Sequence, residues 1–159
     1  MALRRILGKD EDTLRKISRP VTKIDKRINT LIDDMLETLE DAHGAGLAAP
    51  QVGVLRRIVI VDVGEGPIIM INPEITYREG EQETLEGCLS VPGEWGITRR
   101  PMKVRAQYTD RNGDDWEIEG EGLLAKAICH ELDHLDGILY IDNVVRMVDP
   151  SELESDDEE

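Results

Sequence analysis

The sequence predicts an α+β fold, in which antiparallel β-sheets pack around a central C-terminal helix and a second helix lies near the N-terminus. Apolar residues recur at helical spacing in residues 25–42 and again in residues 120–135. Between these segments, residues 57–119 form short β-rich runs separated by glycine and proline. Short runs joined by tight turns indicate antiparallel neighbours, because parallel strands need long crossover connections.

The first helix is expected from about Asp25 to Ala42. Its other face carries Lys, Asp and Glu, and its apolar positions are Ile28, Leu31, Ile32, Met35, Leu36 and Leu39. Asp25 is suited to cap the start of this helix, and Gly44 is placed to end it.

Short strands are expected next, at 58–61, 68–71, 74–78, 103–108 and 115–119. Asn112-Gly113 separates the last two and is a strong signal for a hairpin turn. The second helix is expected from about Gly120 to Leu135. Its apolar side consists of Leu123, Leu124, Ala127, Ile128 and Leu132.

Length and charge predict one folded domain over residues 1–148, followed by a disordered acidic tail at 149–159. The 159 residues suit a single domain, and the tail holds seven acids and no base. The net charge of −15 argues against a nucleic-acid or anionic-membrane surface. No apolar run reaches membrane length and no signal or transit segment is evident, so we expect a cytoplasmic protein.

Residues 130–134, His-Glu-Leu-Asp-His, lie in the second predicted helix. Residues four apart share a helix face, so His130 and His134 can point at one metal ion. Glu131 lies ~100° from His130 and ~60° from His134 around the helix, beside such an ion, as a general base requires. A polar surface turn with incidental histidines is the alternative. It is disfavoured because two of the three histidines stand at this spacing on a helix where their neighbours are apolar.

A catalytic zinc-type site takes three protein ligands, so one further ligand is needed. Tyr140 stands where one zinc-protease pattern has its next histidine, and no convincing downstream helix offers a glutamate. Upstream, His43 adjoins the predicted helix end, whereas Cys129 lies ~140° from His134 and is expected to pack in the core. Cys88 remains, and a thiolate with two imidazoles suits Zn²⁺ or Fe²⁺.

Three motifs occur in one order along the chain: Gly44-Ala45-Gly46-Leu47-Ala48-Ala49-Pro50-Gln51, then Glu86-Gly87-Cys88-Leu89-Ser90, then His130-Glu131-Leu132-Asp133-His134. In order and spacing they resemble the signature motifs of the peptide deformylase family, and the similarity extends to about Val148. Members of this family are metallohydrolases that remove the formyl group from the N-terminal formylmethionine of new bacterial polypeptides and release formate.

The resemblance implies a role for each matching residue. The implied metal ligands are Cys88, His130 and His134, and the implied general acid/base is Glu131. The implied oxyanion donors are Gln51 and the backbone N–H of Leu89. The implied substrate contacts are Gly44, Ala45, Gly46, Leu123 and Ala127. Glu86 and Arg100 match an ion pair that braces the cysteine loop.

Simpler interpretations exist for two of these features. The glycine-rich segment on its own also suits a flexible connector, whereas a phosphate loop would need a following Lys-Ser/Thr that is absent here. Glu86 and Arg100 could each be ordinary surface charges. Cys129 stands where many family members have glutamine, from which we expect a packing difference and no loss of activity.

The resemblance implies one divalent metal per chain, Fe²⁺ first, with Zn²⁺, Ni²⁺ or Co²⁺ as substitutes. It implies formylmethionyl peptides and nascent chains as partners, a transient ribosome contact, a monomer, and no DNA or membrane binding. Three alternatives stay open from the residues alone. They are a small zinc endopeptidase, a non-catalytic module with a structural metal, and a redox switch that uses Cys88 and Cys129.

Overall fold

A computed structural model describes residues 2–149 and 151–152 and confirms the α+β class. Its elements, in chain order, are η1 (Asp12–Arg15), α1 (Lys26–Ala42), β1 (Gly46–Ala48), η2 (Ala49–Val52), β2 (Ile58–Val61), β3 (Ile68–Glu79), β4 (Gln82–Cys88), β5 (Val91–Arg100), β6 (Lys103–Thr109), β7 (Asp115–Glu121), α2 (Leu123–Leu135), η3 (Tyr140–Asp142) and β8 (Val144–Val148). The labels η denote 3₁₀ turns.

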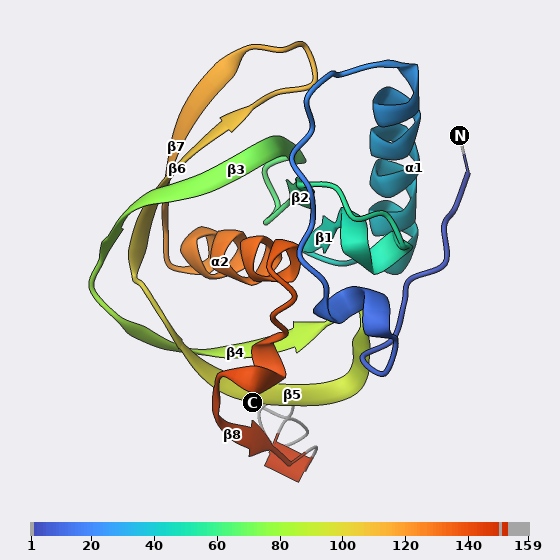
Figure 1. Cartoon of the computed structure of the whole chain (residues 1–159). Helices are drawn as coiled ribbons and strands as arrows, with labels where there is room; N and C mark the ends of the chain where they lie inside the picture. The colour runs from blue at the N-terminus through green and yellow to red at the C-terminus, as the bar shows by residue number, and fades with distance from the viewer. Residues whose placement is uncertain (1, 150, 153–159) are drawn as a thin grey trace.

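The strands form two antiparallel sheets, a five-stranded one in the order β1-β2-β3-β6-β7 and a three-stranded one in the order β4-β5-β8. Helix α2 lies in the centre of the molecule, between the larger sheet and strands β4 and β5, and α1 lies at one end, beside β1 (Figure 1). The architecture is therefore the predicted one, with sheets around the C-terminal helix.

Strand β2 separates two apolar cores. Ile58 and Ile60 pack in the cluster that contains the apolar face of α1, whereas Val59 packs in the cluster of α2. Successive side chains of a strand point to opposite faces, so a strand covered on both faces is apolar at every position. This explains the unbroken run Ile-Val-Ile-Val.

Helix α1 begins at the predicted cap and ends at Ala42 as predicted, but the residue that ends it is not the predicted Gly44. The Asp25 carboxylate accepts a hydrogen bond from the Ile28 N–H at 3.0 Å, which caps the helix. At the other end His43, and not Gly44, adopts the left-handed conformation, with φ of 55°. Gly44 follows it and donates its N–H to the Leu39 carbonyl at 3.4 Å.

Two predicted strands, 68–71 and 74–78, are one strand, β3. The apparent break at Asn72-Pro73 is a register shift against β6, at which Asn72 has a φ of 52°. A bulge of this kind bends a strand without ending it. The prediction of two strands was wrong because a bulge and a turn use similar residues.

Strands β1, β4, β5 and β8 were not predicted. Strand β5 contains Pro92, Gly93 and Gly96, which are typical of turns, and β4 alternates between half-buried and exposed positions without a strongly apolar face. The second helix also begins later than expected, at Leu123, because β7 continues to Glu121 and Gly122 turns the chain with a φ of 57°.

No helix within 2–149 or 151–152 is long and apolar enough to cross a bilayer. The predicted disordered tail, 149–159, lies outside the described residues except for positions 149, 151 and 152.

Candidate functional site

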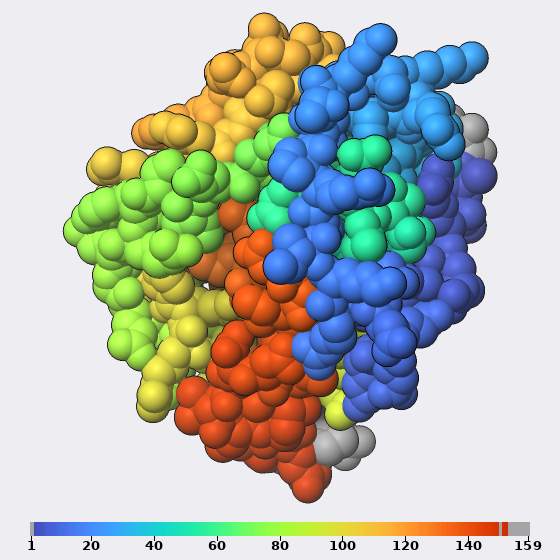
Figure 2. Space-filling model, viewed as in Figure 1, coloured from blue at the N-terminus to red at the C-terminus, as the bar shows by residue number. Residues whose placement is uncertain are grey.

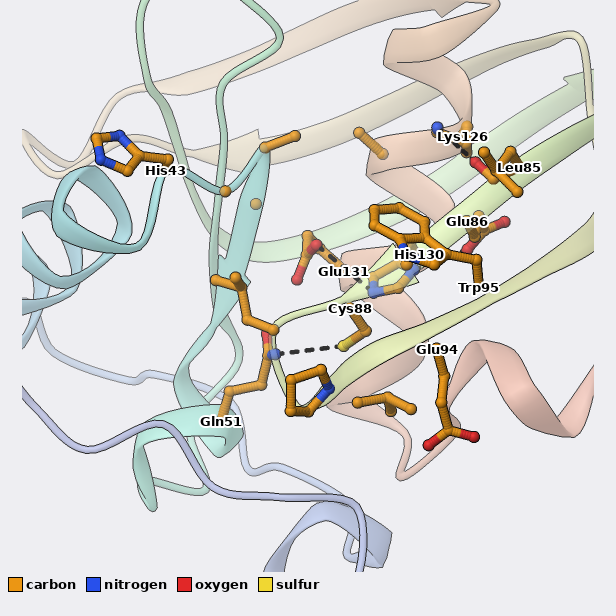
Figure 3. A pocket seen from close by; sticks show the side chains of 18 of the residues that line it. His43, Gln51, Leu85, Glu86, Cys88, Glu94, Trp95, Lys126, His130 and Glu131 are labelled. Carbon is orange, nitrogen blue, oxygen red and sulfur yellow. Dashed lines mark hydrogen bonds and ion pairs between the residues drawn. The ribbon is translucent and has the colours of Figure 1, made fainter. Parts of the chain in front are cut away.

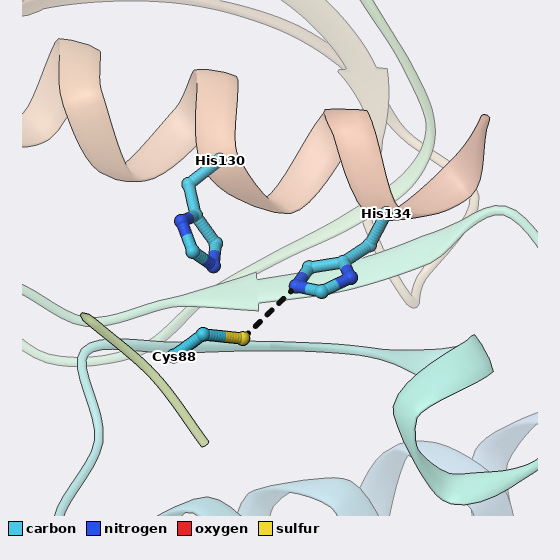
Figure 4. A group of neighbouring side chains, drawn as sticks. All are labelled: Cys88, His130 and His134. Carbon is cyan, nitrogen blue, oxygen red and sulfur yellow. Dashed lines mark hydrogen bonds between the residues drawn. The ribbon is translucent and has the colours of Figure 1, made fainter. Parts of the chain in front are cut away.

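The structure brings Cys88, His130 and His134 together. One ligand atom from each lies within 4.8 Å of the others, and the Cys88 sulfur is 3.4 Å from Nε2 of His134 (Figure 4). Cys88 ends strand β4, and both histidines project from α2. The side chain of His43 is exposed and Cys129 packs in the apolar core, so neither joins this group.

Local features of β4 and β5 present the cysteine. The pairing of these strands shifts register between Glu86 and Cys88. Gly87 lies beneath the Trp95 ring, where any Cβ atom would overlap the ring carbons. A glycine is therefore required beside the cysteine for Trp95 to pack as it does.

Glu86 orients His130 from behind. Its carboxylate accepts a hydrogen bond from Nδ1 of His130 at 2.7 Å, which leaves Nε2 of the ring for the metal site. Arg100 binds the same carboxylate in bidentate fashion, at 2.6 and 2.8 Å, and also donates to Asp133 at 2.8 Å. Glu86 and Arg100 are both buried, so neither is a surface charge.

The carboxylate of Glu86 stays ionised despite its burial. Burial alone raises its pKa, but hydrogen bonds from Arg100 and His130 outweigh that effect and bring the pKa to about 2. Thr98 donates a further short hydrogen bond to the same group.

The charges around the group suit a divalent cation. Burial lowers the pKa of His130, but the charge of Glu131 and hydrogen bonds with Cys88 and Glu86 outweigh it and raise that pKa to about 10, so the ring position favours a positive charge, which a metal ion on Nε2 would supply in place of the proton. Burial holds the pKa of His134 well below its usual value, so this ring is in its neutral, ligating form. A thiolate with two imidazoles in negatively charged surroundings fits Zn²⁺ or Fe²⁺, and we assign the group as a metal site.

Glu131 lies beside the metal site without joining it. Its Oε2 is 4.0 Å from Nε2 of His130, and its Oε1 is buried without a hydrogen-bond partner. Burial, chiefly, raises its pKa to about 7. Gly46 packs directly against this carboxylate, where a Cβ atom would overlap it.

A cavity of ≈ 460 Å³ opens onto the metal site (Figure 3). The family resemblance gives a role to thirteen residues, and all of them except His134 and Arg100 line this cavity. The predicted residues in its wall are Gly44, Ala45, Gly46, Gln51, Glu86, Cys88, Leu89, Leu123, Ala127, His130 and Glu131.

Gln51 turns its amide nitrogen toward the cysteine. Its Oε1 accepts the Ala48 N–H at 2.9 Å, which fixes the side chain. Its Nε2 donates to the Ser90 hydroxyl at 3.0 Å. The same nitrogen lies 3.6 Å from the Cys88 sulfur (Figure 3). The buried amide is thus oriented at both ends.

Three residues of the site were missed. Ser90 belongs to the second motif, and its hydroxyl accepts the hydrogen bond that orients Gln51. Lys126 lines the cavity and donates to the Leu85 carbonyl at 3.0 Å. Its position four residues before His130 places both on one helix face, a signal that could have identified it. Trp95 also lines the cavity, which only the strand register reveals.

A family model and individual relatives both match this chain to the same family. The family model described as polypeptide deformylase matches residues 3–149. A peptide deformylase of Caldicellulosiruptor bescii is 53% identical over 154 residues, which cover 97% of this chain and 93% of that protein. One from Agathobacter rectalis is 58% identical over 144 residues, 91% of each chain.

Solved structures agree. A crystal structure of a peptide deformylase from Legionella pneumophila superposes with a TM-score of 0.87 at 46% identity, covering 89% of this chain and 86% of that one. The peptide deformylase of Thermotoga maritima gives a TM-score of 0.87 at 40% identity, with 89% and 97% covered. The chain therefore belongs to the polypeptide deformylase family.

Proposed function

We propose that this chain hydrolyses the formyl group from the N-terminal formylmethionine of newly synthesised polypeptides and releases formate. The observation that carries the proposal is the position of Glu131, whose carboxylate lies beside the Cys88/His130/His134 group and faces the cavity. A structural zinc site is normally closed by four protein ligands, whereas here three ligands adjoin a potential base.

Cys88, His130 and His134 would hold one divalent cation, which when bound would act as a Lewis acid toward the formyl carbonyl and lower the pKa of water toward ~7. We infer Fe²⁺ as the physiological ion, as in the family, with Zn²⁺, Ni²⁺ or Co²⁺ able to replace it. The softness of the thiolate supports this set of metals.

Glu131 is the proposed general acid/base. Its pKa of about 7 lets it accept a proton near neutral pH and return it. It takes a proton from the attacking water, and it delivers that proton to the amine nitrogen as the carbon–nitrogen bond breaks. The products are formate and a peptide with a free amino terminus.

Gln51 and the backbone N–H of Leu89 are the proposed donors to the oxyanion that develops on the formyl oxygen. The orientation of the Gln51 amide toward Cys88 supports this role, since donors act best when they are held in place before the reaction. Removal of one such donor typically costs roughly 10²–10³ in rate.

The substrate backbone is proposed to align along Gly44, Ala45 and Gly46. Strand β1 is one of the two edge strands of its sheet, so an extended peptide can add beside it through main-chain hydrogen bonds. The methionine side chain enters the cavity beside Ala45, Ala127 and Leu123.

We further propose that residues 1–148 form one catalytic domain, that the protein acts as a monomer in the cytoplasm, and that it contacts the ribosome transiently as it meets nascent chains. The first claim is supported by the span of the family match, 3–149.

The test is formate release from a formylmethionyl peptide by protein purified anaerobically, with its metal content measured. Glu131→Ala should keep metal and fold and abolish formate release. Unchanged activity in this variant would overturn the catalytic assignment. Cleavage of internal peptide bonds without formate would favour a zinc endopeptidase instead.

A further inference from the structure

The basic residues of this acidic protein are unevenly distributed. Residues 15–27 contain six bases and one acid, a local charge of +5 in a chain whose total is −15. These bases are Arg15, Lys16, Arg19, Lys23, Lys26 and Arg27. The net charge therefore conceals a strongly positive segment.

This segment runs across one face of the molecule, from η1 to α1 (Figures 1 and 2). The backbones of Arg19 and Arg56 form an isolated parallel β-bridge, and the Arg19 N–H donates to the Leu55 carbonyl at 3.0 Å. The Asn72 side chain exchanges two hydrogen bonds of 2.8 Å with the backbone of Val21. The backbone is thus bound to neighbouring elements, and Ser18 and Val21 are buried, whereas the basic side chains of the segment are exposed.

Most of these cations have no anionic partner. Nearby, Arg4, Arg15 and Arg57 each form an ion pair with an aspartate, at 2.5 to 3.0 Å. Six others form no ion pair with any residue in 2–149 or 151–152, and all but the half-buried Arg56 are exposed. We call these six the basic face: Lys16, Arg19, Lys23, Lys26, Arg27 and Arg56.

Three members of the basic face line a cavity of ≈ 400 Å³, namely Lys23, Arg27 and Arg56. The carboxylate of Asp25 also lines it, but this group caps α1 through the Ile28 N–H. Lys26 and Arg27 stand in the first turn of α1, where the helix dipole is itself positive and disfavours cations. A bound anion would relieve this unbalanced positive charge.

We propose that the basic face binds the phosphate backbone of RNA. Several unpaired Lys and Arg side chains along an extended segment suit a repeated anion, because each can contact a separate phosphate. The choice of RNA over another polyanion rests on the proposed function, since a newly synthesised polypeptide is met where RNA is abundant. The acidic remainder of the chain does not prevent binding, because salt screens charges over ~8 Å at physiological ionic strength.

The test is fluorescence anisotropy with a labelled RNA hairpin, titrated with the full, metal-loaded chain over a series of KCl concentrations. The wild type should bind with an affinity that falls steeply with salt. The triple variant Lys23→Gln/Arg27→Gln/Arg56→Gln should weaken binding at least 10-fold and reduce the slope of log K against log salt by ~2 to 3.

A second variant, Lys23→Gln/Arg27→Gln, changes exposed side chains only and keeps the half-buried Arg56. A loss of RNA affinity in this variant therefore does not come from misfolding caused by the Arg56 substitution. The matched control, Arg78→Gln/Arg99→Gln/Arg105→Gln, removes the same charge from exposed positions on the sheets and should bind RNA like the wild type.

Formate release is measured for every variant and should be unchanged, so that failure of RNA binding is separated from failure of the proposed enzyme activity. Equal loss of RNA affinity in the sheet control would overturn the basic face as the site. Equal affinity for poly-glutamate would overturn RNA in favour of an acidic protein partner.

Discussion

Glu86 accepts a hydrogen bond from Nδ1 of His130 at 2.7 Å, with both side chains buried behind the metal site. The contact selects the tautomer in which Nε2 is free to ligate, and it links the ligand to the Glu86–Arg100 ion pair. The metal site therefore depends on the charged carboxylate of Glu86, which is not itself one of the metal ligands.

We expect Glu86→Gln to weaken metal binding by roughly 10–100-fold, the usual cost of removing such a partner. It should also destabilise the fold by about 3 kcal/mol, because Arg100 loses the carboxylate that compensates its buried charge. Chelator competition and denaturant unfolding measure the two effects. Glu83→Gln, an exposed change on the same strand, should alter neither quantity, and equal effects from both variants would contradict this explanation.

Gly46→Ala should impair catalysis more than metal binding. The added methyl group overlaps the Glu131 carboxylate and displaces it from its position beside the metal site. We expect kcat to fall at least 10-fold at nearly full metal content, since general acid/base catalysis is worth typically 10²–10⁴. Gly8→Ala is the control, because a Cβ there meets no atom within 4 Å. Loss of metal in parallel with activity would point to general disruption.

Cys129 should resist thiol reagents. Burial in the apolar core raises its pKa to about 11, so almost none of it is thiolate at pH 7. In metal-free protein we expect iodoacetamide to modify the half-buried Cys88 and to reach Cys129 only after unfolding. Peptide mass mapping before and after denaturant measures this. Rapid alkylation of Cys129 in the folded protein would show that the site around it opens.

Asp34 should make stability depend on pH through the N-terminal segment. The Ala2 N–H, at 2.8 Å, and the Arg4 guanidinium, at 2.9 Å, hold the pKa of this carboxylate below its usual value. The folded state thus favours the ionised form. Its contribution is complete above the unfolded pKa of ~3.9, and it is lost as pH falls through the lower folded value.

Asp34→Asn should accordingly be less stable than the wild type at pH 6, on the order of 1 kcal/mol, and the difference should shrink toward pH 2. Urea unfolding at several pH values measures this difference. A difference that stays constant with pH would show that shape, and not charge, is what Asp34 contributes.

The features that could be predicted from the residues alone are those set by spacing along a single helix. His130, Glu131 and His134 are related by helical periodicity, so one segment of sequence predicted two ligands, the neighbouring carboxylate and a core position for Cys129. The same periodicity predicted α1 and its Asp25 cap. The resemblance to a family added residues from distant segments.

Tertiary structure alone decided the rest. Arg100 meets Glu86 only because β4 and β5 pair in one particular register, and that register placed Trp95 over Gly87. The basic face likewise depends on the backbone β-bridge that places Arg19 beside Arg56. The net charge of the chain alone had argued against a nucleic-acid surface. Helical spacing follows from hydrogen bonds between residues four apart, but strand register and surface charge arise from contacts between residues far apart in the chain.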